Sequence, residues 1–148
     1  MKIVFADRDG VINTDRSDYV KSWSEFEFLP GSLDALKLLT LNDYHVILIT
    51  NQSVINRKMV TEEELQDIHA KMEDAVIDHG GRIKAVYYCP HVPEDGCSCR
   101  KPEPGLIERA KADHPFVRSK EELHYYRLFA ERFPGEHATA TVGQWPFL

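Results

Sequence analysis

Three short apolar runs along the chain have the length of buried strands. They lie at residues 2–6, 45–50 and 85–89. The second run, H-V-I-L-I-T, is mostly aliphatic, which is typical of a strand covered on both faces of a parallel sheet. Residues 15–28 mix charged and aromatic side chains without a clean period, so we expect a loop or a small hairpin there.

Stretches with helical spacing of apolar side chains fill the intervals between these runs. The spacing predicts helices over residues 32–42, 61–79 and 104–111. Thr61, followed three residues later by Glu64, is typical of a capping box at the start of the second helix. Strands that alternate with helices predict right-handed crossovers, and therefore an α/β, Rossmann-like parallel sheet with helices on both faces.

Composition limits the classes of function. The chain has 148 residues, which fits one domain over residues 1–148. Its 18 Lys and Arg against 24 Asp and Glu give a formal charge of −6, which favours neither nucleic acid nor an anionic membrane as a partner. No apolar run approaches the roughly 18 residues of a membrane span, and the charges from Asp7 onward interrupt the apolar start too early for a signal peptide. We therefore expect a small, soluble, cytoplasmic domain.

Polar residues that could bind a ligand or react follow each predicted strand. In parallel sheets, ligands bind at these strand ends. Asp7 and Asp9 follow the first strand. They have two interpretations: a solvated acidic turn, or a nucleophile that attacks phosphorus beside a general acid/base. In the second interpretation, repulsion between these carboxylates and the phosphate requires a divalent cation, for which Mg²⁺ is best suited.

The other two strand ends add groups that bind phosphate. Thr50 and Asn51 offer a hydroxyl and backbone amides, although both residue types are also common in ordinary turns. Arg100 and Lys101 form a basic pair beyond the third strand. The pair is either a solvated surface feature or a phosphate grip, with Lys101 acting as a point charge.

All cysteines of the chain lie close together. Cys89, His91, Cys97 and Cys99 have the spacing C-x-H-x5-C-x-C. An odd number of clustered cysteines argues against a disulfide scaffold. Three thiolates and one imidazole form a closed tetrahedral set, which suits a structural Zn²⁺ and leaves no position open for substrate.

The order of these motifs resembles the haloacid dehalogenase (HAD) superfamily of phosphatases. The resembling segments are D-R-D-G-V-I-N, I-T-N-Q-S and C-x-H-x5-C-x-C-R-K-P-x-P-G, within roughly residues 1–110. They are most similar to the subgroup of heptose-bisphosphate and histidinol-phosphate phosphatases. The resemblance implies a HAD-like Rossmann sheet without a large cap domain and with an inserted zinc loop.

The resemblance also implies roles for individual residues. Asp7 is expected to be the nucleophile and Asp9 the acid/base, with Mg²⁺ held by the Asp7 carboxylate and the Asp9 main-chain carbonyl. The positions expected to hold phosphate or sugar are Thr50, Asn51, Arg100 and Lys101. Heptose 1,7-bisphosphate is the first expected substrate, and histidinol phosphate or another sugar phosphate is the alternative. A relative that only binds phosphate, as a structural or binding module, is the competing class.

Residues 111–148 depart from the superfamily pattern. The superfamily carries an acidic G-D-x-x-x-D segment after a further strand, which completes the Mg²⁺ site; around Tyr126 the chain has L-H-Y-Y-R, without a carboxylate. We predict no buried parallel strand beyond Lys111 and an amphipathic helix over residues 119–133. A missing strand would leave a sheet edge open, which favours a homo-oligomer. Candidate replacement carboxylates are Glu121, Glu122 and Glu131, or a group from a neighbouring subunit.

Overall fold

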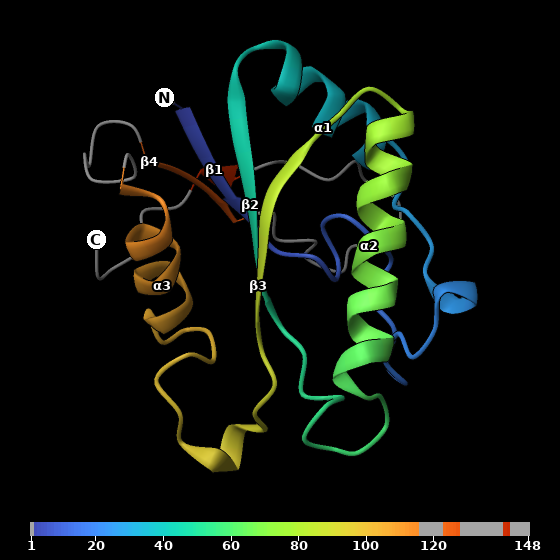
Figure 1. Ribbon diagram of the computed structural model, residues 1–148, viewed down its shortest axis with the longest axis vertical. Coiled ribbons are helices and arrows are strands. Elements are labelled where there is room, and N and C mark those ends of the chain that lie inside the picture. Colours follow the sequence, from blue (N-terminus) through green and yellow to red (C-terminus); the bar gives the residue numbers. More distant parts are fainter. Residues whose placement is uncertain (1, 116–122, 128–140, 143–148) are drawn as a thin grey trace.

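The sheet is built around the first strand of the chain. The computed structural model describes residues 2–115, 123–127 and 141–142. Its five strands have the order β3-β2-β1-β4-β5, and Figure 1 shows β1 to β4 in the middle of the molecule. The strands are β1 (Lys2–Ala6), β2 (Tyr44–Asn51), β3 (Ile83–Cys89), β4 (Leu123–Arg127) and β5 (Thr141–Val142). Among the strands that the structure describes, the pairs β1–β2, β2–β3 and β1–β4 are parallel, and the β4–β5 pair is antiparallel.

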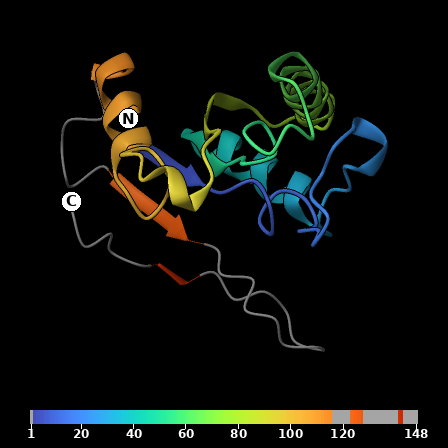
Figure 2. The same cartoon turned by 90° about the horizontal axis from the view of Figure 1, so that it is seen from below.

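Helices cover both faces of the sheet. They are α1 (Ser32–Leu41), α2 (Glu62–Asp78) and α3 (Gly105–Asp113), with short 3-10 turns η1 (Trp23–Glu25) and η2 (Pro93–Asp95). Figure 2, seen from below, shows α3 apart from α1 and α2 across the sheet. The predicted capping box is present at α2, where the Glu64 N–H donates to Thr61 Oγ1 at 3.2 Å and the Thr61 N–H donates to Glu64 Oε2 at 2.8 Å.

Alternation along the strands divides the core into two apolar clusters. On one face, Ile3 and Phe5 of β1 pack in a cluster with Leu106 of α3. On the other face, Val4 of β1 packs in a cluster with Met72 of α2. Because successive strand residues point to opposite faces, one apolar strand serves both clusters. The prediction of a parallel sheet covered on both sides is therefore confirmed. Within the described residues, no helix is long and apolar enough to cross a membrane.

The elements up to α3 follow the predictions closely. β1 has the predicted bounds, β2 is one residue longer at each end, and β3 begins at Ile83 rather than residue 85. For residues 15–28 we expected a loop or a small hairpin, and the segment is a loop with one short 3-10 turn. Trp23, Phe26 and Phe28 form a ring cluster there, with centroids 5.0 to 6.3 Å apart.

The prediction for the C-terminal region was wrong where the structure describes it. Leu123–Arg127 is a strand rather than part of a helix, and its residues pair in parallel with β1 from Ile3↔Leu123 to Phe5↔Tyr125. The run contains two tyrosines, which favour strands, and it pairs with the side of β1 that β2 leaves open. The rest of the predicted helix lies outside the described residues. β4 also removes the open β1 edge on which the expectation of a homo-oligomer depended, and the oligomeric state stays a prediction.

Candidate active site

The carboxyl ends of β1 and β2 and the loop after β3 meet at one edge of the sheet. The Lys101 ammonium contacts Asp7 Oδ2. Asn51 binds the backbone of Lys101 twice: its Oδ1 accepts from the Lys101 N–H at 3.0 Å and its Nδ2 donates to the Lys101 carbonyl at 3.3 Å. Gln52 Nε2 donates to Asp9 Oδ2 at 2.7 Å and to Thr50 Oγ1 at 2.9 Å. Five of the predicted residues thus form one constellation.

Asp7 is the more accessible of the two carboxylates. Its side chain is 38% exposed, whereas that of Asp9 is 25% exposed. The Arg8 N–H donates to Asp7 Oδ1 at 2.8 Å, which fixes one carboxylate oxygen, while Lys101 meets the other. An exposed carboxylate oriented by an amide and an ammonium is suited to attack a bound electrophile.

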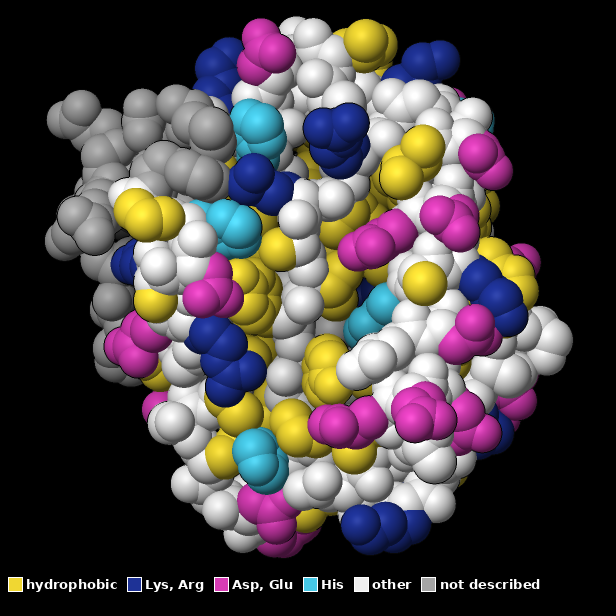
Figure 3. All heavy atoms as spheres, viewed as in Figure 1, with side chains coloured by type: hydrophobic (Ala, Val, Ile, Leu, Met, Phe, Trp, Pro, Cys, Tyr) yellow, Lys and Arg dark blue, Asp and Glu magenta, His cyan; other side chains and the backbone are white. Residues whose placement is uncertain are grey.

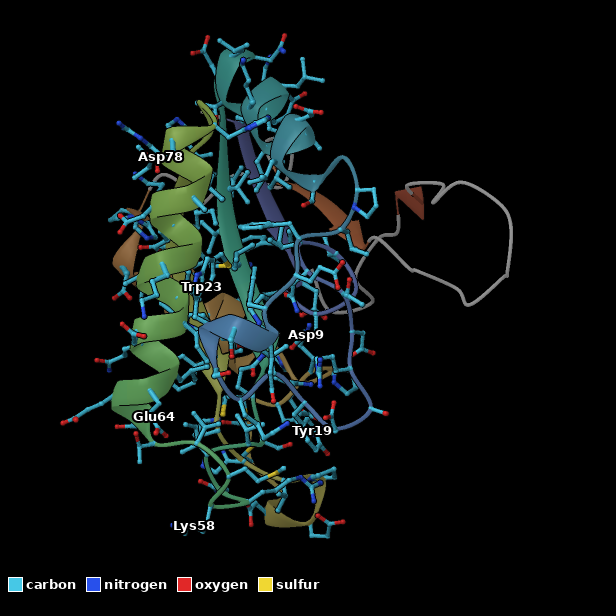
Figure 4. The ribbon with its side chains drawn as sticks, turned by 90° about the vertical axis from the view of Figure 1, so that its right-hand side faces the viewer. Asp9, Tyr19, Trp23, Lys58, Glu64 and Asp78 are labelled. Carbon is cyan, nitrogen blue, oxygen red and sulfur yellow. The ribbon has the colours of Figure 1, made fainter. Side chains whose placement is uncertain are left out.

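Asp9 is held by a dense set of donors. Its Oδ1 accepts from Arg8 Nε at 3.2 Å, from Arg8 Nη2 at 2.9 Å and from Asn13 Nδ2 at 2.9 Å. Its Oδ2 accepts from Gln52. Figure 4 labels Asp9 in the loop that follows β1. A carboxylate fixed from both oxygens has a defined direction in which to deliver or accept a proton.

The loop after β1 is shaped by its own backbone. The Arg8 carbonyl accepts from the N–H groups of Val11, Ile12 and Asn13, at 3.2, 2.8 and 3.2 Å. Gly10 has φ 78°, in the left-handed region that favours glycine and permits this tight turn. The turn brings Asn13 back to the carboxylate of Asp9.

Arg100 is placed differently from Lys101. Its Nη1 donates to the His91 carbonyl at 3.0 Å, so its described contact is with the cysteine loop rather than with the aspartates. Both basic residues line a cavity of about 520 Å³ beside the loop. The other lining residues are Pro93, Gly96, Cys97, Ser98, Pro102 and Glu103. This cavity has room for the part of a ligand that extends beyond a phosphate.

The four predicted metal ligands form one cluster, and their ligand atoms all lie within 4.8 Å of one another. The three sulfur–sulfur distances are 3.1, 3.6 and 3.6 Å, and His91 Nδ1 lies 3.4 Å from Cys89 Sγ and 3.2 Å from Cys99 Sγ. A tetrahedral ion with Zn–S bonds of about 2.3 Å requires sulfurs about 3.8 Å apart, close to this spacing. The cluster therefore fits a metal ion.

The thiols of the cluster have shifted pKa values. Burial raises the pKa of Cys89 to about 12, with help from the neighbouring thiol of Cys99. At Cys97 desolvation also acts upward, but backbone hydrogen bonds from Cys99 and Arg100 outweigh it, and the pKa falls to about 7. Metal binding must displace a proton from Cys89, so the affinity is expected to rise with pH.

The loop joins α3 through a close backbone contact. The Gly105 N–H donates to the Ser98 carbonyl at 2.9 Å. A Cβ at Gly105 would lie 2.4 Å from that same oxygen, so a side chain there would force the loop away from the helix. The cluster, Lys101 and the start of α3 are thus placed together.

The interpretation of the sequence missed four residues of this region: Arg8, Asn13, Gln52 and His69. Arg8 is 1% exposed although it is charged, and its Nη1 lies 3.1 Å from His69 Nε2. Burial, and next the charge of Arg8, lower the pKa of His69 to about 3. One signal was present in the sequence: His69 lies on the apolar stripe of α2, between Leu65 and Met72, where a polar residue needs a buried partner.

Comparisons with known proteins agree with the fold and the motifs. The family described as polynucleotide kinase 3 phosphatase matches residues 2–128. The structure of a putative HAD-like phosphatase from Mesorhizobium loti is 27% identical, with a TM-score of 0.68 over 76% of this chain and 57% of that one. The fold is therefore HAD-like. The chain belongs to the polynucleotide kinase 3 phosphatase family.

Several individual relatives are named for one particular phosphatase activity. A D-glycero-beta-D-manno-heptose-1,7-bisphosphate 7-phosphatase from Neisseria meningitidis serogroup B is 50% identical over 108 residues, which is 73% of this chain and 58% of that protein. A probable heptose-1,7-bisphosphate 7-phosphatase from Thermoplasma volcanium is 40% identical, over 77% of each protein. The Bordetella bronchiseptica D,D-heptose 1,7-bisphosphate phosphatase, solved with magnesium and phosphate, is 44% identical with a TM-score of 0.75, over 78% of this chain and 64% of that one. The chain spans less than two thirds of the length of the Neisseria and Bordetella relatives.

Proposed function

We propose that this chain hydrolyses a phosphate monoester of a small sugar through a phosphoaspartate intermediate, and that its substrate is D-glycero-D-manno-heptose 1,7-bisphosphate, cleaved at the 7-phosphate. The observation that supports the proposal is the convergence of Asp7, Asp9, Thr50 and Lys101 at one sheet edge, from three segments far apart in sequence. The similarity to heptose bisphosphatases over most of the chain supports the choice of sugar.

In the first step, an Asp7 carboxylate oxygen forms a bond to phosphorus as the bond between phosphorus and the ester oxygen breaks. Asp9 donates its proton to that departing oxygen. In the second step, Asp9 takes a proton from water, the water attacks the acyl-phosphate, and the Asp7 carboxylate is restored with release of inorganic phosphate. The two roles of Asp9 require the fixed direction that its donors provide.

Two other residues bind the transferring group. Thr50 Oγ1 accepts from Gln52, so its hydroxyl proton can be donated to a phosphoryl oxygen. Lys101 carries the positive charge that offsets the phosphate, and its contact with Asp7 places that charge beside the bond being formed. Asn51 fixes the Lys101 backbone, and Arg100 offers a charge at the adjoining cavity for the rest of the substrate.

Two metal ions fit the residues present. The Asp7 carboxylate and the Asp9 main-chain carbonyl are hard oxygen donors that would hold Mg²⁺, which supplies positive charge for the phosphoryl oxygens. The cluster of three cysteines and one histidine would hold a structural Zn²⁺ that shapes the loop carrying Lys101.

Phosphate release from the purified chain tests the proposal. We expect Mg²⁺-dependent release from heptose 1,7-bisphosphate, and slower release from histidinol phosphate and other sugar phosphates at equal concentration. The control is Asp7→Asn, which retains the side-chain volume and removes the nucleophile. Turnover by that variant at the rate of the unaltered chain would contradict the phosphoaspartate route. Phosphate binding without turnover by the unaltered chain would favour a binding module instead.

A further inference from the structure

Arg8 is a buried cation between the two candidate catalytic aspartates. Its side chain is 1% exposed, and the guanidinium carbon lies 6.0 Å from the centroid of the Phe26 ring. A buried charge is tolerated when its hydrogen-bonding groups are paired in good geometry. Two of its nitrogens, Nε and Nη2, donate to one oxygen of Asp9. The third nitrogen, Nη1, meets His69 Nε2 at 3.1 Å.

The contact with His69 has a defined polarity. A guanidinium only donates, so His69 Nε2 accepts and carries no proton. His69 is therefore neutral, with its proton on Nδ1. Its ring is 7% exposed and lies 6.0 Å from the Tyr88 ring, between centroids, so packing as well as the hydrogen bond fixes its orientation.

The elements that carry this contact are far apart in sequence. Arg8 follows β1, whereas His69 lies on the buried face of α2. In Figure 4, Glu64 marks the end of α2 at which the helix begins, and Asp78 marks its other end, away from Tyr19 and Lys58. His69 is therefore in the half of α2 nearer the loops of the site, and it contacts the one guanidinium nitrogen that does not bind Asp9.

The two oxygens of Asp9 are consequently unequal. Oδ1 accepts three hydrogen bonds, two of them from a cation, whereas Oδ2 accepts one from the neutral amide of Gln52. Hydrogen bonds from charged donors are the stronger ones. Oδ1 is therefore the anchored oxygen, and Oδ2 is the oxygen with fewer partners.

We propose that His69 is a positioning residue for Asp9: by accepting from the Arg8 guanidinium it keeps Oδ1 anchored, so that Oδ2 is the oxygen presented to the leaving group. This inference rests on the proposed function, because it deepens the role of Asp9 there. It predicts that loss of the acceptor at position 69 impairs protonation of the leaving group more than it impairs attack by Asp7.

The acceptor can be removed or replaced at nearly constant shape. His69→Phe retains an aromatic ring against Tyr88 but offers no lone pair to Arg8. His69→Gln supplies an amide oxygen at a reach close to that of Nε2. Met72→Leu, on the same buried face of α2, changes packing at a side chain that offers Arg8 no acceptor, and it serves as the matched control.

Esters with different leaving groups separate the positioning role from a structural one. Heptose 1,7-bisphosphate releases an alkoxide that needs a proton, whereas 2,4-dinitrophenyl phosphate releases a stable phenolate that does not. We expect His69→Phe to lower kcat/KM about tenfold or more for the sugar ester and less than about threefold for the aryl ester, since acid catalysis typically contributes 10²- to 10⁴-fold. His69→Gln should restore most of the loss, and Met72→Leu should affect both esters equally. Equal losses for both esters in His69→Phe would overturn the proposal.

The tautomer gives a readout that does not depend on turnover. Nitrogen-15 spectra of the histidine side chains at pH 7, with the His69 signal assigned by its absence in His69→Gln, should show an unprotonated Nε2 and a protonated Nδ1. A protonated Nε2 would overturn the proposal. If the unaltered chain hydrolyses neither ester, the proposed function is contradicted. The spectrum would still decide whether His69 accepts from Arg8.

Discussion

The two loops that meet at the candidate active site are held by different means. The loop after β1 is built into the core: Arg8 and Asn13 are buried, and three backbone N–H groups converge on one carbonyl. The loop between β3 and α3 is half-buried or exposed throughout, and its backbone contacts with the rest of the molecule include those with Asn51, with the Asn56 N–H and with Gly105. In Figure 1 it extends away from the sheet below α3. Asp7, the proposed nucleophile, is therefore placed by folding of the core, whereas Lys101 is placed by Asn51 and by the loop that carries the cysteine cluster.

The largest expected effect separates chemistry from folding in the first loop. Asp7→Asn should abolish measurable turnover while the melting temperature changes little, because Asp7 is partly exposed and its replacement still accepts from the Arg8 N–H. Phosphate release and thermal melting, measured on the same preparation, check both parts. A large fall in melting temperature would show that the first loop depends on the nucleophile for its structure.

Loss of a thiol should act on the second loop alone. Cys97→Ser is expected to lower the zinc content from about one ion per chain, because a closed four-ligand site loses a ligand. Displacement of Lys101 should then lower kcat/KM by roughly tenfold to a hundredfold, since misplacement by an ångström can cost about a hundredfold. Metal analysis and kinetics provide the measurement. Ser98→Ala, one residue away and outside the cluster, is the control, and full zinc content in Cys97→Ser would contradict the assignment of ligands.

The concentration of Mg²⁺ needed for activity tests whether the lack of a carboxylate in β4, the strand beside β1, weakens the magnesium site. β4 lies beside β1, but its sequence L-H-Y-Y-R provides no carboxylate, and the candidate replacements Glu121, Glu122 and Glu131 lie outside the described residues. Because Mg²⁺ prefers near-octahedral oxygen coordination, we expect half-maximal activity only at about 1 mM Mg²⁺ or above. Titration of activity with Mg²⁺ measures this, and saturation at micromolar concentrations would show that another carboxylate completes the site.

The smallest expected effect is the change in folding stability with pH that the buried His69 causes. The pKa of His69 is lowered to about 3, mainly by burial, whereas an unfolded histidine has a pKa of about 6.5. Between these values the unfolded chain binds a proton that the folded chain does not, so stability falls as the pH falls through this window, by at most about 1.4 kcal/mol per pH unit. Urea unfolding of the unaltered chain and of His69→Gln should differ in this slope below pH 6.5. Parallel pH profiles would contradict the buried neutral state of His69.

Local patterns predicted most of the fold and failed at one specific point. β1, α1 and α2 follow from apolar spacing and a capping box, which are local in sequence. β4 could not be recognised in this way, because its pairing with β1 depends on an edge that exists only after the first three strands assemble.

In the candidate site too, local motifs could be predicted from the sequence, whereas contacts between distant residues could not. Asp7, Asp9 and the cysteine cluster lie in short motifs at strand ends, and the structure brings them to one edge. The contact between Arg8 and His69 joins positions 61 residues apart and has no local pattern beyond a polar residue on an apolar stripe. Arg100 illustrates a further limit: the sequence places it beside Lys101, yet its described contact is with the cysteine loop.

The contact between Ser98 and Gly105 has a consequence for how this protein can diversify. The loop is clamped at the end of β3 by Cys89 and at the start of α3 by Gly105, while the turn Pro93–Asp95 and Gly96 between the clamps are exposed. Figure 3 shows a hydrophobic band along β3 between α3 and α2, above this exposed turn. Residues of the turn line the cavity but make none of the contacts that place Lys101. If the proposed function holds, we expect substitutions there to alter the choice of sugar while the proposed phosphate-binding groups stay fixed, so that selectivity can be changed separately from catalysis.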